Sequence, residues 1–583
     1  GDRLPEGQYP LEIARITLSV EGGEAQPWGT PATRVSENGD GTGSVWEWDG
    51  SEMIGVQLGD KTTTYTLNTD HTLLADRQLY WTSTAPNQPV TAWYPATDGT
   101  LDLRDQDTNG LAYLLHGTGT GDYLTPVTLT FAHRLAKVRV TPSDDALDQV
   151  QSLQLYTYTQ CTYEKGTVVQ GSQEGWIEMK KCEYTENGNA FTCWEANVVP
   201  GYTITKLMAN NDNKERDLSA AITPVAGKFY NITLDKDKGY TDDGQGNYTV
   251  TSAEGLKNIA KLVNEEWKSD INITLTADIN LSGIDWTPIG IDYNHQYTGT
   301  FNGGGHTITG LTVTGSDQYA GLFGYIGSGG TVKNVVLKDV QIESDNQYGC
   351  VGGVAGNSDG NIENCSVSGS VSSRHTAGGV VGQQFGGSIT LCGSSATVKG
   401  TGEVGGVAGK TDNSATLTAC YATGNVTFER ASTINTFAGG VVGFNGTGSI
   451  LTACYATGNV TGTGTGTGSC YVGGITGDNS SGTLTACYHA TGTVSGPDGA
   501  TGGVTGRNYT SLGAPVITAC YWGDNGQEQG IGYNQAGTIG GTEQVTDGNW
   551  QNAVTQMNAA LSGKGWQYEL KDGNSLPALK KEQ

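Results

Sequence analysis

In the C-terminal half of the chain, small or apolar residues alternate with polar ones in short segments that recur along the sequence. The segment LTACYATGNV occurs twice with imperfect copies on either side, at 362–371, 417–426, 451–460 and 484–494. In the copy at 451–460 the small or apolar residues lie two positions apart, at Cys454, Ala456, Gly458 and Val460. This spacing predicts a strand with one buried face.

A glycine-bracketed apolar tetrad, such as GVVG at 440, precedes each copy. The seven tetrads begin at 321, 353, 379, 406, 440, 474 and 503. A period of roughly thirty residues is typical of one solenoid coil, and stacked coils place equivalent residues about 4.8 Å apart in ladders. We therefore predict a parallel β-helix over 248–540, right-handed by analogy. We expect the tetrad glycines to supply positive φ and close backbone approach at its tight corners.

One cysteine occupies the same place in six consecutive coils: Cys365, Cys392, Cys420, Cys454, Cys487 and Cys520. Free cysteine is a small hydrophobe and is among the most buried residue types, so we expect an internal ladder of free thiols. Disulfides along the ladder and a metal site are the alternatives. A straight column does not direct several thiolates at one ion, which disfavours the metal.

The residue after this cysteine is tyrosine in four coils, followed once by tryptophan: Tyr421, Tyr455, Tyr488, Tyr521 and Trp522. Alternation places these rings opposite the buried face and predicts an exposed aromatic stripe. Ring stacking alone would stabilise the coils. The other interpretation is a binding platform for sugar rings or for a partner protein.

The N-terminal part lacks the tetrads and consists of short alternating segments between turns, among them LEIARITLSV, TTYTLN and AKVRVTP. This pattern predicts β-sandwiches. We place one at 1–142 and a second at 143–237. A linker at 238–247, rich in Gly and Asp, should follow.

Two amphipathic helices should close the ends of the β-helix. At 252–268, Thr251 and Glu254 form a capping box, and the buried face is expected to hold Leu256, Ile259, Val263 and Trp267. A C-terminal cap is expected at 541–583, where one helical face carries Trp550, Val554, Met557 and Leu561 and Gly563 ends the helix. Such caps protect open strand edges from aggregation.

Two smaller patterns suggest local chemistry. Cys182 and Cys193 are symmetric about Asn187–Gly188, a two-residue hairpin signal, so a cross-strand disulfide is one expectation. The segment DQDTNG offers Asp105, Asp107 and Asn109 as calcium ligands. The twelfth position of that loop is His116 instead of a carboxylate, and the alternative is an Asx-rich turn. We expect no other cofactor.

Composition narrows the classes of function. The 583 residues carry a net charge of −27, with 32 Lys and Arg against 59 Asp and Glu, and 89 are Gly. This balance disfavours nucleic-acid and anionic-membrane partners. No apolar run is long enough for a membrane span, and we expect any targeting segment or lipid anchor to lie outside this sequence.

Catalysis is disfavoured by the charged residues of the repeats, which are sparse and change position between coils: Glu363, Arg374, His375, Glu403, Lys410, Asp412, Asp478 and Arg507. Glycoside chemistry would need paired carboxylates on one face. None of the seven histidines lies in the zinc-binding spacing HExxH. We predict a protein that is not an enzyme.

Two resemblances support a more specific prediction. LPEGQYPLEI, AWYP, GLAYLLHG and FAHRLAKVRVTP, at 4–13, 92–95, 110–117 and 131–142, together resemble the fimbrillin family, pilus and adhesin proteins of Bacteroides-type bacteria. The similarity covers about residues 4–237. The tetrads and the lead-in ITLTADINLSGIDWTPIG resemble the GLUG-repeat group.

The fimbrillin resemblance implies export as an outer-membrane lipoprotein, tandem transthyretin-like sandwiches and, in some members, polymerisation by strand donation. A large solenoid follows the sandwiches here, which favours a terminal or surface-tethered subunit. We therefore predict an all-β, extracellular cell-surface or fimbrial adhesin that binds a host glycan or protein and contacts other fimbrial subunits. The alternatives are a secreted carbohydrate-active enzyme of the lyase or hydrolase type and a structural pilus-assembly subunit or spacer.

Overall fold

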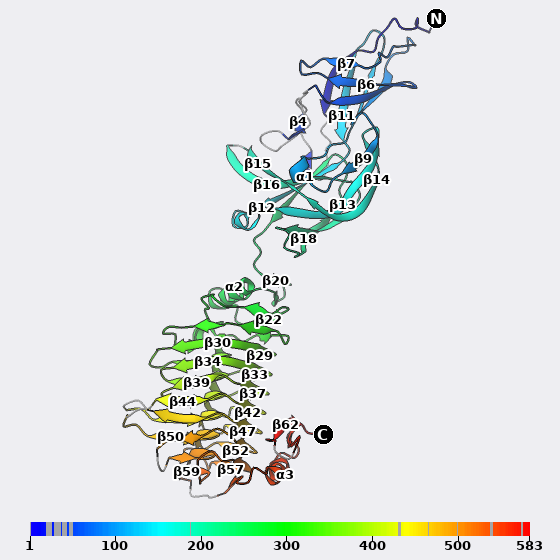
Figure 1. Cartoon of the computed structure of the whole chain (residues 1–583). Helices are drawn as coiled ribbons and strands as arrows, with labels where there is room; N and C mark the ends of the chain where they lie inside the picture. The colour runs from blue at the N-terminus through cyan, green and yellow to red at the C-terminus, as the bar shows by residue number, and fades with distance from the viewer. Residues whose placement is uncertain are drawn as a thin grey trace. The chain divides into compact units, whose positions relative to one another are not determined.

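The chain is almost entirely β-structure and divides into two compact units, residues 1–237 and 238–583 (Figure 1). The computed structural model describes residues 2–18, 26–27, 36–37, 44–45, 50–186, 188–429, 433–463, 466–497, 500–536, 540–572 and 575–583. The described part contains no helix with the length and apolarity of a membrane span.

The first unit begins with a seven-stranded sheet around its own hydrophobic core. Its strands, in spatial order, are β1 (Ile13–Leu18), β11 (Val127–His133), β10 (Leu115–Gly121), β8 (Gln88–Tyr94), β5 (Met53–Leu58), β6 (Lys61–Leu67) and β7 (Leu73–Ala75). Strand β1 pairs with β11 in parallel and the other pairs are antiparallel. A short strand pair, β3 (Ser36–Glu37) and β4 (Ser44–Val45), lies outside this sheet.

The second sandwich packs two sheets on a common apolar core. One sheet contains β15 (Lys180–Glu186), β16 (Asn189–Val198), β12 (Ala136–Pro142), β19 (Lys228–Leu234) and β2 (Gln26–Pro27). The other contains β14 (Thr167–Glu178), β13 (Leu153–Glu164), β17 (Ile204–Ala209), β18 (Arg216–Ile222) and β9 (Gly99–Asp102). Two short helical turns complete the unit, α1 (Gln106–Asn109) and η1 (Leu147–Gln149).

The sheets cross the sequence boundary expected at 142. Strand β12 was assigned to the first sandwich, but it pairs with β16 and β19 at the centre of a sheet of the second. Strand β9 likewise pairs with β13. Long-range pairing thus joins segments that turn signals along the sequence would separate.

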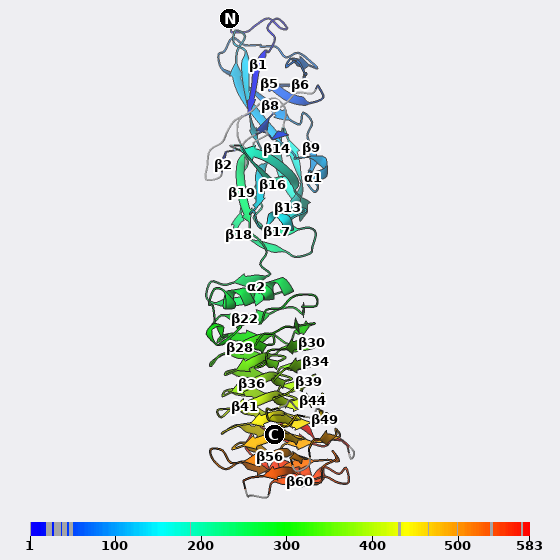
Figure 2. The ribbon, with the colours of Figure 1, turned by 90° about the vertical axis from the view of Figure 1, so that its left-hand side faces the viewer.

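The second unit is a β-helix of stacked coils with four strand columns (Figure 2). The strands pair in parallel from coil to coil, and the β20–β21 hairpin at the start is antiparallel. We number the columns as faces 1 to 4 in the order in which the chain visits them in each coil. Face 1 contains β20 (Tyr240–Asp242), β21 (Asn247–Val250), β22 (Asn272–Leu275), β24 (Thr300–Asn302), β29 (Thr331–Lys333), β33 (Asn361–Glu363), β37 (Ser388–Thr390), β42 (Thr416–Thr418), β47 (Ile450–Thr452), β52 (Thr483–Thr485) and β57 (Val516–Thr518).

Face 2 is the broadest column, because many coils contribute two short strands to it. Its members are β23 (Ile279–Asn280), β25 (Thr307–Thr309), β26 (Thr312–Val313), β30 (Val336–Ser344), β34 (Ser366–Ser373), β38 (Gly393–Ser394), β39 (Thr397–Gly400), β43 (Tyr421–Ala422), β44 (Val426–Glu429), β48 (Tyr455–Ala456), β49 (Val460–Thr463), β53 (Tyr488–His489), β54 (Val494–Ser495), β58 (Cys520–Trp522) and β60 (Thr542–Gln544).

Faces 3 and 4 flank the glycine tetrads. Face 3 contains β27 (Tyr319–Ala320), β31 (Cys350–Gly352), β35 (Thr376–Gly378), β40 (Glu403–Gly405), β45 (Thr436–Gly439), β50 (Cys470–Gly473) and β55 (Thr501–Gly502). Face 4 contains β28 (Phe323–Ile326), β32 (Ala355–Ser358), β36 (Val381–Phe385), β41 (Ala408–Asp412), β46 (Val442–Asn445), β51 (Thr476–Ser480), β56 (Thr505–Tyr509) and β59 (Ile531–Asn534). One apolar core runs from Tyr248 to Trp522 inside the four faces.

The tetrad glycines allow close approach of neighbouring coils, but they do not supply positive φ. A Cβ built on Gly440 would lie 2.1 Å from the carbonyl oxygen of Gly474 in the next coil, and none of the fourteen tetrad glycines has a left-handed φ. The left-handed residues are instead those just before the ladder cysteines, such as Ala453 with φ +55°. This turn divides the single strand expected at 451–460 between β47 and β48.

The N-terminal end of the β-helix differs in three details from expectation. The predicted linker 238–247 contains β20, which forms a hairpin with β21. Helix α2 (Ala253–Asn264) is capped by Ser252, not Thr251, because the Ser252 hydroxyl accepts from the Gly255 backbone N–H at 3.0 Å. Trp267 lies beyond the helix and is 63% exposed, although it was expected on the buried face.

Candidate functional site

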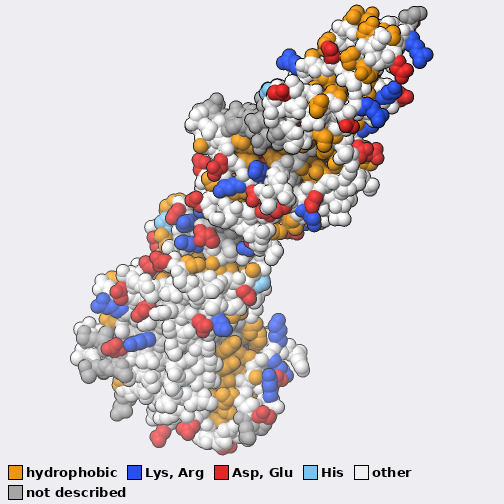
Figure 3. Space-filling model, turned by 45° about the horizontal axis from the view of Figure 1, so that its top comes forward, with side chains coloured by type: hydrophobic (Ala, Val, Ile, Leu, Met, Phe, Trp, Pro, Cys, Tyr) orange, Lys and Arg blue, Asp and Glu red, His pale blue; other side chains and the backbone are white. Residues whose placement is uncertain are grey.

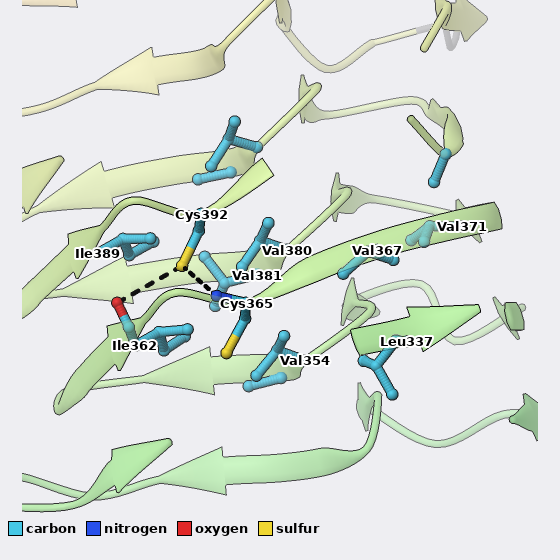
Figure 4. Packing of buried hydrophobic residues seen from close by; sticks show 14 of the residues in the cluster. Leu337, Val354, Ile362, Cys365, Val367, Val371, Val380, Val381, Ile389 and Cys392 are labelled. Carbon is cyan, nitrogen blue, oxygen red and sulfur yellow. Dashed lines mark hydrogen bonds between the residues drawn. The ribbon is translucent and has the colours of Figure 1, made fainter. Parts of the chain in front are cut away.

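The six ladder cysteines lie at the corner between faces 1 and 2, and all are buried and free. Each thiol donates to backbone carbonyls; Cys454 Sγ, for example, lies 3.4 Å from Thr452 O and 3.5 Å from Leu417 O of the preceding coil. Figure 4 shows the corresponding contacts of Cys392 with Ile362 O and with the Cys365 backbone nitrogen. Burial raises the pKa of the Cys454 thiol well above its usual range, which keeps the sulfur protonated.

The tyrosines that follow the cysteines form a stack on the outside of the same corner. Tyr421, Tyr455 and Tyr488 pair in register on face 2 and constitute what we call the tyrosine stack. The ring centroids are 5.4 Å apart between Tyr421 and Tyr455 and 5.0 Å apart between Tyr455 and Tyr488, with interplanar angles of 11° and 3°. The repeat therefore stabilises itself through equivalent rings in adjacent coils.

The C-terminal segment covers the end of this stack, so the expectation of a fully exposed stripe was wrong. Tyr488 and Tyr521 are each at most 4% exposed and lie in one cluster with the C-terminal segment. Trp522 is also 4% exposed, but it belongs to the core inside the coils. Tyr488 contacts the Trp550 ring and donates its hydroxyl to Pro577 O at 2.6 Å. The covering elements are α3 (Gln551–Ala560), β61 (Trp566–Glu569) and β62 (Ala578–Lys581).

The expected apolar face of the C-terminal helix is buried, but it packs against the side of the coils. Val554 and Met557 belong to one cluster with Ala453, Ala486 and Tyr488. The Tyr568 hydroxyl donates to Ala486 O at 2.8 Å. The segment predicted to cap the end thus extends back along the β-helix (Figure 1) and covers Tyr488 and Tyr521.

The uncovered part of the corner retains an apolar surface. Tyr421 and Tyr455 are half-buried, and Val336 and Leu391 nearby are each 36% exposed. A cavity of about 220 Å³ lies beside Tyr421, lined in addition by Val336, Leu391, Asn334 and Asn364, among others. Figure 3 shows a column of hydrophobic side chains along the β-helix. We call Val336, Leu391, Tyr421 and Tyr455 the exposed apolar column.

Several charged residues of the repeats, expected to be scattered, meet along the edge between faces 3 and 4. His375 Nδ1 lies 3.2 Å from Glu403 Oε2, which also accepts from the Thr376 hydroxyl at 2.7 Å. The Glu403 hydrogen bond raises the pKa of His375 above its usual value. Lys410 and Asp412 form a looser pair at 3.9 Å. Glu363 and Arg374 remain separate and exposed.

Further along the same edge, aromatic rings enclose an Arg–Asp pair. The Arg507 guanidinium lies 4.4 Å from the ring centroids of both Tyr471 and Tyr509, and its Nε donates to Asp478 Oδ2 at 3.0 Å. Asp478 is fully buried, and burial raises the pKa of its carboxyl despite Arg507. Register explains the cluster, because Asp478 and Arg507 are direct partners on β51 and β56.

This edge has the composition of a catalytic site but not the arrangement of one. Each carboxylate that comes together here already interacts with a cation: Glu403 with His375, Asp412 with Lys410 and Asp478 with Arg507. General acid–base chemistry needs a carboxyl group that can reach a substrate, and Asp478 has no exposed surface. The arrangement stabilises the edge between the two faces.

The two smaller patterns of the first unit have clear structural surroundings. Asp105 caps α1 by accepting from Thr108 N at 3.0 Å, and Asp107 accepts from Lys181 N at 3.1 Å. Asn109 ends the same short helix, so this segment is a capped helical turn. Over the described ranges, no three His, Cys, Asp or Glu side chains are grouped to hold a metal ion.

Cys182 and Cys193 are direct cross-strand partners on β15 and β16, and both are free thiols. The turn residue Asn187 lies outside the described residues. The two cysteines occupy the opposite positions that a cross-strand disulfide needs, but the structure does not contain the bond, so the disulfide is not confirmed. A hydrogen bond from Cys193 lowers the pKa of the Cys182 thiol. Next to them, fully buried Glu195 lies 3.2 Å from both Lys137 and Arg139 and also accepts from the Tyr184 hydroxyl.

Sequence reasoning missed the charged edge because insertions between tetrads change the residue spacing. His375 and Glu403 are 28 positions apart, whereas Asp478 and Arg507 are 29 apart in another part of the repeat. Aligning the coils on their tetrads, instead of counting residues, would have placed Asp478 and Arg507 together. No sequence pattern near Tyr488 or Tyr521 indicated that the C-terminal segment would cover them.

A family model, the GLUG motif, matches residues 347–372. Two curated proteins are similar to parts of the chain. Halomucin of Haloquadratum walsbyi is 32% identical over 184 residues, 29% of this chain. A glycine-rich membrane protein of Evansella cellulosilytica is 36% identical over 123 residues, 21% of this chain. The matched parts span only 2% and 14% of those two proteins.

Three solved structures illustrate the partial likeness of this chain to known proteins. An immunoglobulin A1 protease from Bacteroides ovatus is 19% identical, covers 59% of this chain and 94% of its own, and has a TM-score of 0.38. A cell adhesion protein from Bacteroides uniformis is 20% identical, covers 40% and 95%, and has a TM-score of 0.26. The fimbrial anchor protein Mfa2 of Porphyromonas gingivalis is 9% identical, covers 39% and 90%, and has a TM-score of 0.21. The family model confirms the GLUG motif, predicted from the glycine tetrads, for the coil at 347–372.

Proposed function

We propose that this protein is a cell-surface adhesin that binds a host or matrix ligand and catalyses no reaction. The observation that carries the proposal is the exposed apolar column. Val336, Tyr421 and Tyr455 lie on one register line of face 2, in which Ser366 and Gly393 occupy the two coils between Val336 and Tyr421. Leu391 lies beside this line, at the turn before Cys392. Exposed apolar surface on a soluble protein commonly marks a site of interaction. A rigid stack of coils presents such contacts in a line, where weak contacts add by avidity.

The proposal includes a location on the outside of the cell. The GLUG match and the names of the two curated relatives, a halomucin and a membrane protein, support an extracellular position on the cell surface. We further propose a lipid anchor to the outer membrane and a position at the tip of a fimbria or tethered directly to the surface. The resemblance of residues 4–237 to fimbrillins supports other fimbrial subunits as partners.

The absence of turnover is part of the proposal. It is supported by the charged edge between faces 3 and 4, where Glu403, Asp412 and Asp478 each face a cation. A hydrolase or lyase would need at least one of these carboxylates to be available to a substrate. Incubating the protein with host and bacterial polysaccharides should release no reducing ends or unsaturated products.

The adhesive role can be tested with beads coated with the whole chain and presented to epithelial cells, matrix proteins and a glycan array. The wild type should bind at least one of these surfaces, and Tyr421→Ser with Leu391→Ser should reduce the bound fraction several-fold. Tyr348→Ser is the matched control, because Tyr348 is 66% exposed but lies outside the column. Equal binding by the double variant would refute the column, and the array separates glycan from protein ligands.

A further inference from the structure

A pocket of about 410 Å³ lies near the N-terminal end of the β-helix, beside α2 and the short helix η2 (Tyr293–His295). We call it the Trp267 pocket. Its lining residues are Val263, Trp267, Ser269, Asn294, His295, Gln296, Thr298 and Ser328. It is separate from the exposed apolar column and from the charged edge, which do not share these residues.

Trp267 is held in an unusual backbone conformation. Its φ is +57°, in the left-handed region that bulky residues rarely adopt. Such a conformation is strained and persists only where its surroundings enforce it. Two backbone hydrogen bonds enforce it here, from Lys268 N to Leu262 O at 3.1 Å and from Ser269 N to Trp267 O at 3.0 Å. The result is an indole that stays 63% exposed.

The indole also rests on a fixed support. The centroids of the Trp267 and His295 rings are 4.1 Å apart, with an interplanar angle of 32°. His295 Nδ1 lies 2.8 Å from Asp292 Oδ1, and the same oxygen accepts from the backbone N–H groups of Asn294 and His295. A preorganised aromatic surface loses little entropy when a ligand stacks on it.

The remaining walls are polar but uncharged. Ser269, Thr298 and Ser328 contribute hydroxyls, and Asn294 and Gln296 contribute amides. These groups both donate and accept hydrogen bonds. None of the eight lining residues is Lys, Arg, Asp or Glu, and the titratable lining residue, His295, is already paired with Asp292.

We propose that the Trp267 pocket binds a neutral sugar ring. A pyranose has a face of C–H groups that can lie against an indole and a rim of hydroxyls that both donate and accept hydrogen bonds. The pocket supplies both partners side by side, an exposed aromatic face and uncharged hydroxyl and amide groups. This proposal does not depend on the exposed apolar column, which lies on other coils.

The test uses the whole chain and six neutral sugars: glucose, galactose, mannose, fucose, N-acetylglucosamine and N-acetylgalactosamine. Saturation-transfer difference NMR should detect at least one of them, with a dissociation constant on the order of 1 mM. Trp267→Ala should weaken that binding at least tenfold, and Trp267→Phe should restore part of it. Tyr348→Ala is the matched control and should bind as the wild type does.

The exposed position of Trp267 predicts that Trp267→Ala folds normally, which circular dichroism checks. Asn294→Ala provides a second, independent variant and should weaken binding several-fold. Absence of binding by every sugar, or unchanged binding by both Trp267→Ala and Asn294→Ala, would overturn the proposal. Cell attachment lost in the Tyr421 and Leu391 double variant, but sugar binding retained, would separate this pocket from the adhesive function.

Discussion

The two units of this chain differ in how their buried contacts are distributed. The first unit has a buried charge cluster that occurs once, and the second repeats the same contacts from coil to coil. In the second sandwich, one fully buried carboxylate, Glu195, faces Lys137, Arg139 and Tyr184 in a cluster that occurs once. In the β-helix, the same cysteine contact and the same glycine contact recur in coil after coil. A unique cluster concentrates its stability in a few side chains, whereas a ladder distributes it over neighbouring coils.

The sharpest way to break this contrast is to remove the charge of Glu195. Glu195→Gln should destabilise the first unit by about 3 to 5 kcal/mol, because Lys137 and Arg139 would remain buried opposite an amide. Although burial by itself raises it, Lys137 and Arg139 hold the pKa of Glu195 below its usual value, so the Glu195 carboxylate is ionised. Urea unfolding, with hydrogen exchange of β12 and β16 peptides, measures the loss.

Its control is Glu215→Gln, which removes the partly exposed ion pair with Lys206 at 3.1 Å. Surface pairs of this kind contribute about 0 to 1 kcal/mol. If the two variants lose similar amounts of unfolding free energy, the Glu195 cluster does not contribute more stability than a surface ion pair.

A smaller loss is expected from crowding the ladder of the β-helix. Gly440→Ala would place a Cβ 2.1 Å from Gly474 O and 2.7 Å from the Ala456 Cβ, which should cost about 3 kcal/mol. Hydrogen exchange should increase in the coils around 440 and 474 and stay unchanged in distant coils. Gly540→Ala, where nothing lies within 4 Å of the added Cβ, should be neutral. A uniform increase over all coils would contradict a distributed ladder.

Replacing one ladder thiol should have a milder effect. Cys454→Ser buries a hydroxyl, but Thr452 O and Leu417 O remain as acceptors, so we expect a loss of about 1 to 2 kcal/mol. Thermal and urea unfolding provide the value. Thr457→Ser, at a half-buried position of the same segment, should change stability less. An unchanged unfolding midpoint for Cys454→Ser would show that the cysteine ladder does not stabilise the β-helix as part of its buried core.

The smallest expected effect is a pH dependence at the charged edge. The hydrogen bond to Glu403 raises the pKa of His375 from its ordinary value of 6.5. The stabilisation by His375 is therefore fully present below about pH 6.5 and is lost as the pH rises through the raised pKa. The groups that face His375 are Glu403, Thr376 and Lys410.

Unfolding free energies of the wild type and His375→Gln, measured from pH 5 to 9, check this sign. The difference should be largest at the acidic end and should decrease with rising pH. Glu403 stays ionised over this range, because its pKa lies below its ordinary value of 4.5 despite its burial. A difference that grows with pH would contradict the His375–Glu403 pair.

The β-helix was predictable to a large extent because its information is local and repeated. The tetrads and the LTACYATGNV copies mark equivalent positions, and parallel pairing of identical segments keeps those positions in register. The role of the tetrad glycines was only half predicted. Their small size is needed for contact between coils, while Ala419, Ala453, Ala486 and Ala519 adopt the left-handed turns.

The surfaces were much less predictable, since they depend on which distant segment covers them. Tyr455 and Tyr488 follow the same cysteine in near-identical segments, yet Tyr455 is half-buried and Tyr488 is covered by residues 550 to 579. Trp267 shows the reverse case, because a helical pattern predicted burial and the chain turned away after Asn264.

The amino-acid sequence by itself determined the repeat, the buried cysteine positions and the separation at residue 237, because each depends on neighbours in the chain or on equivalent residues one coil away. Tertiary structure alone decided that β2, β9 and β12 join the sheets of the second sandwich and that the C-terminal segment covers Tyr488. Those features arise from contacts between segments whose sequence separation carries no fixed period, so no local pattern could specify them.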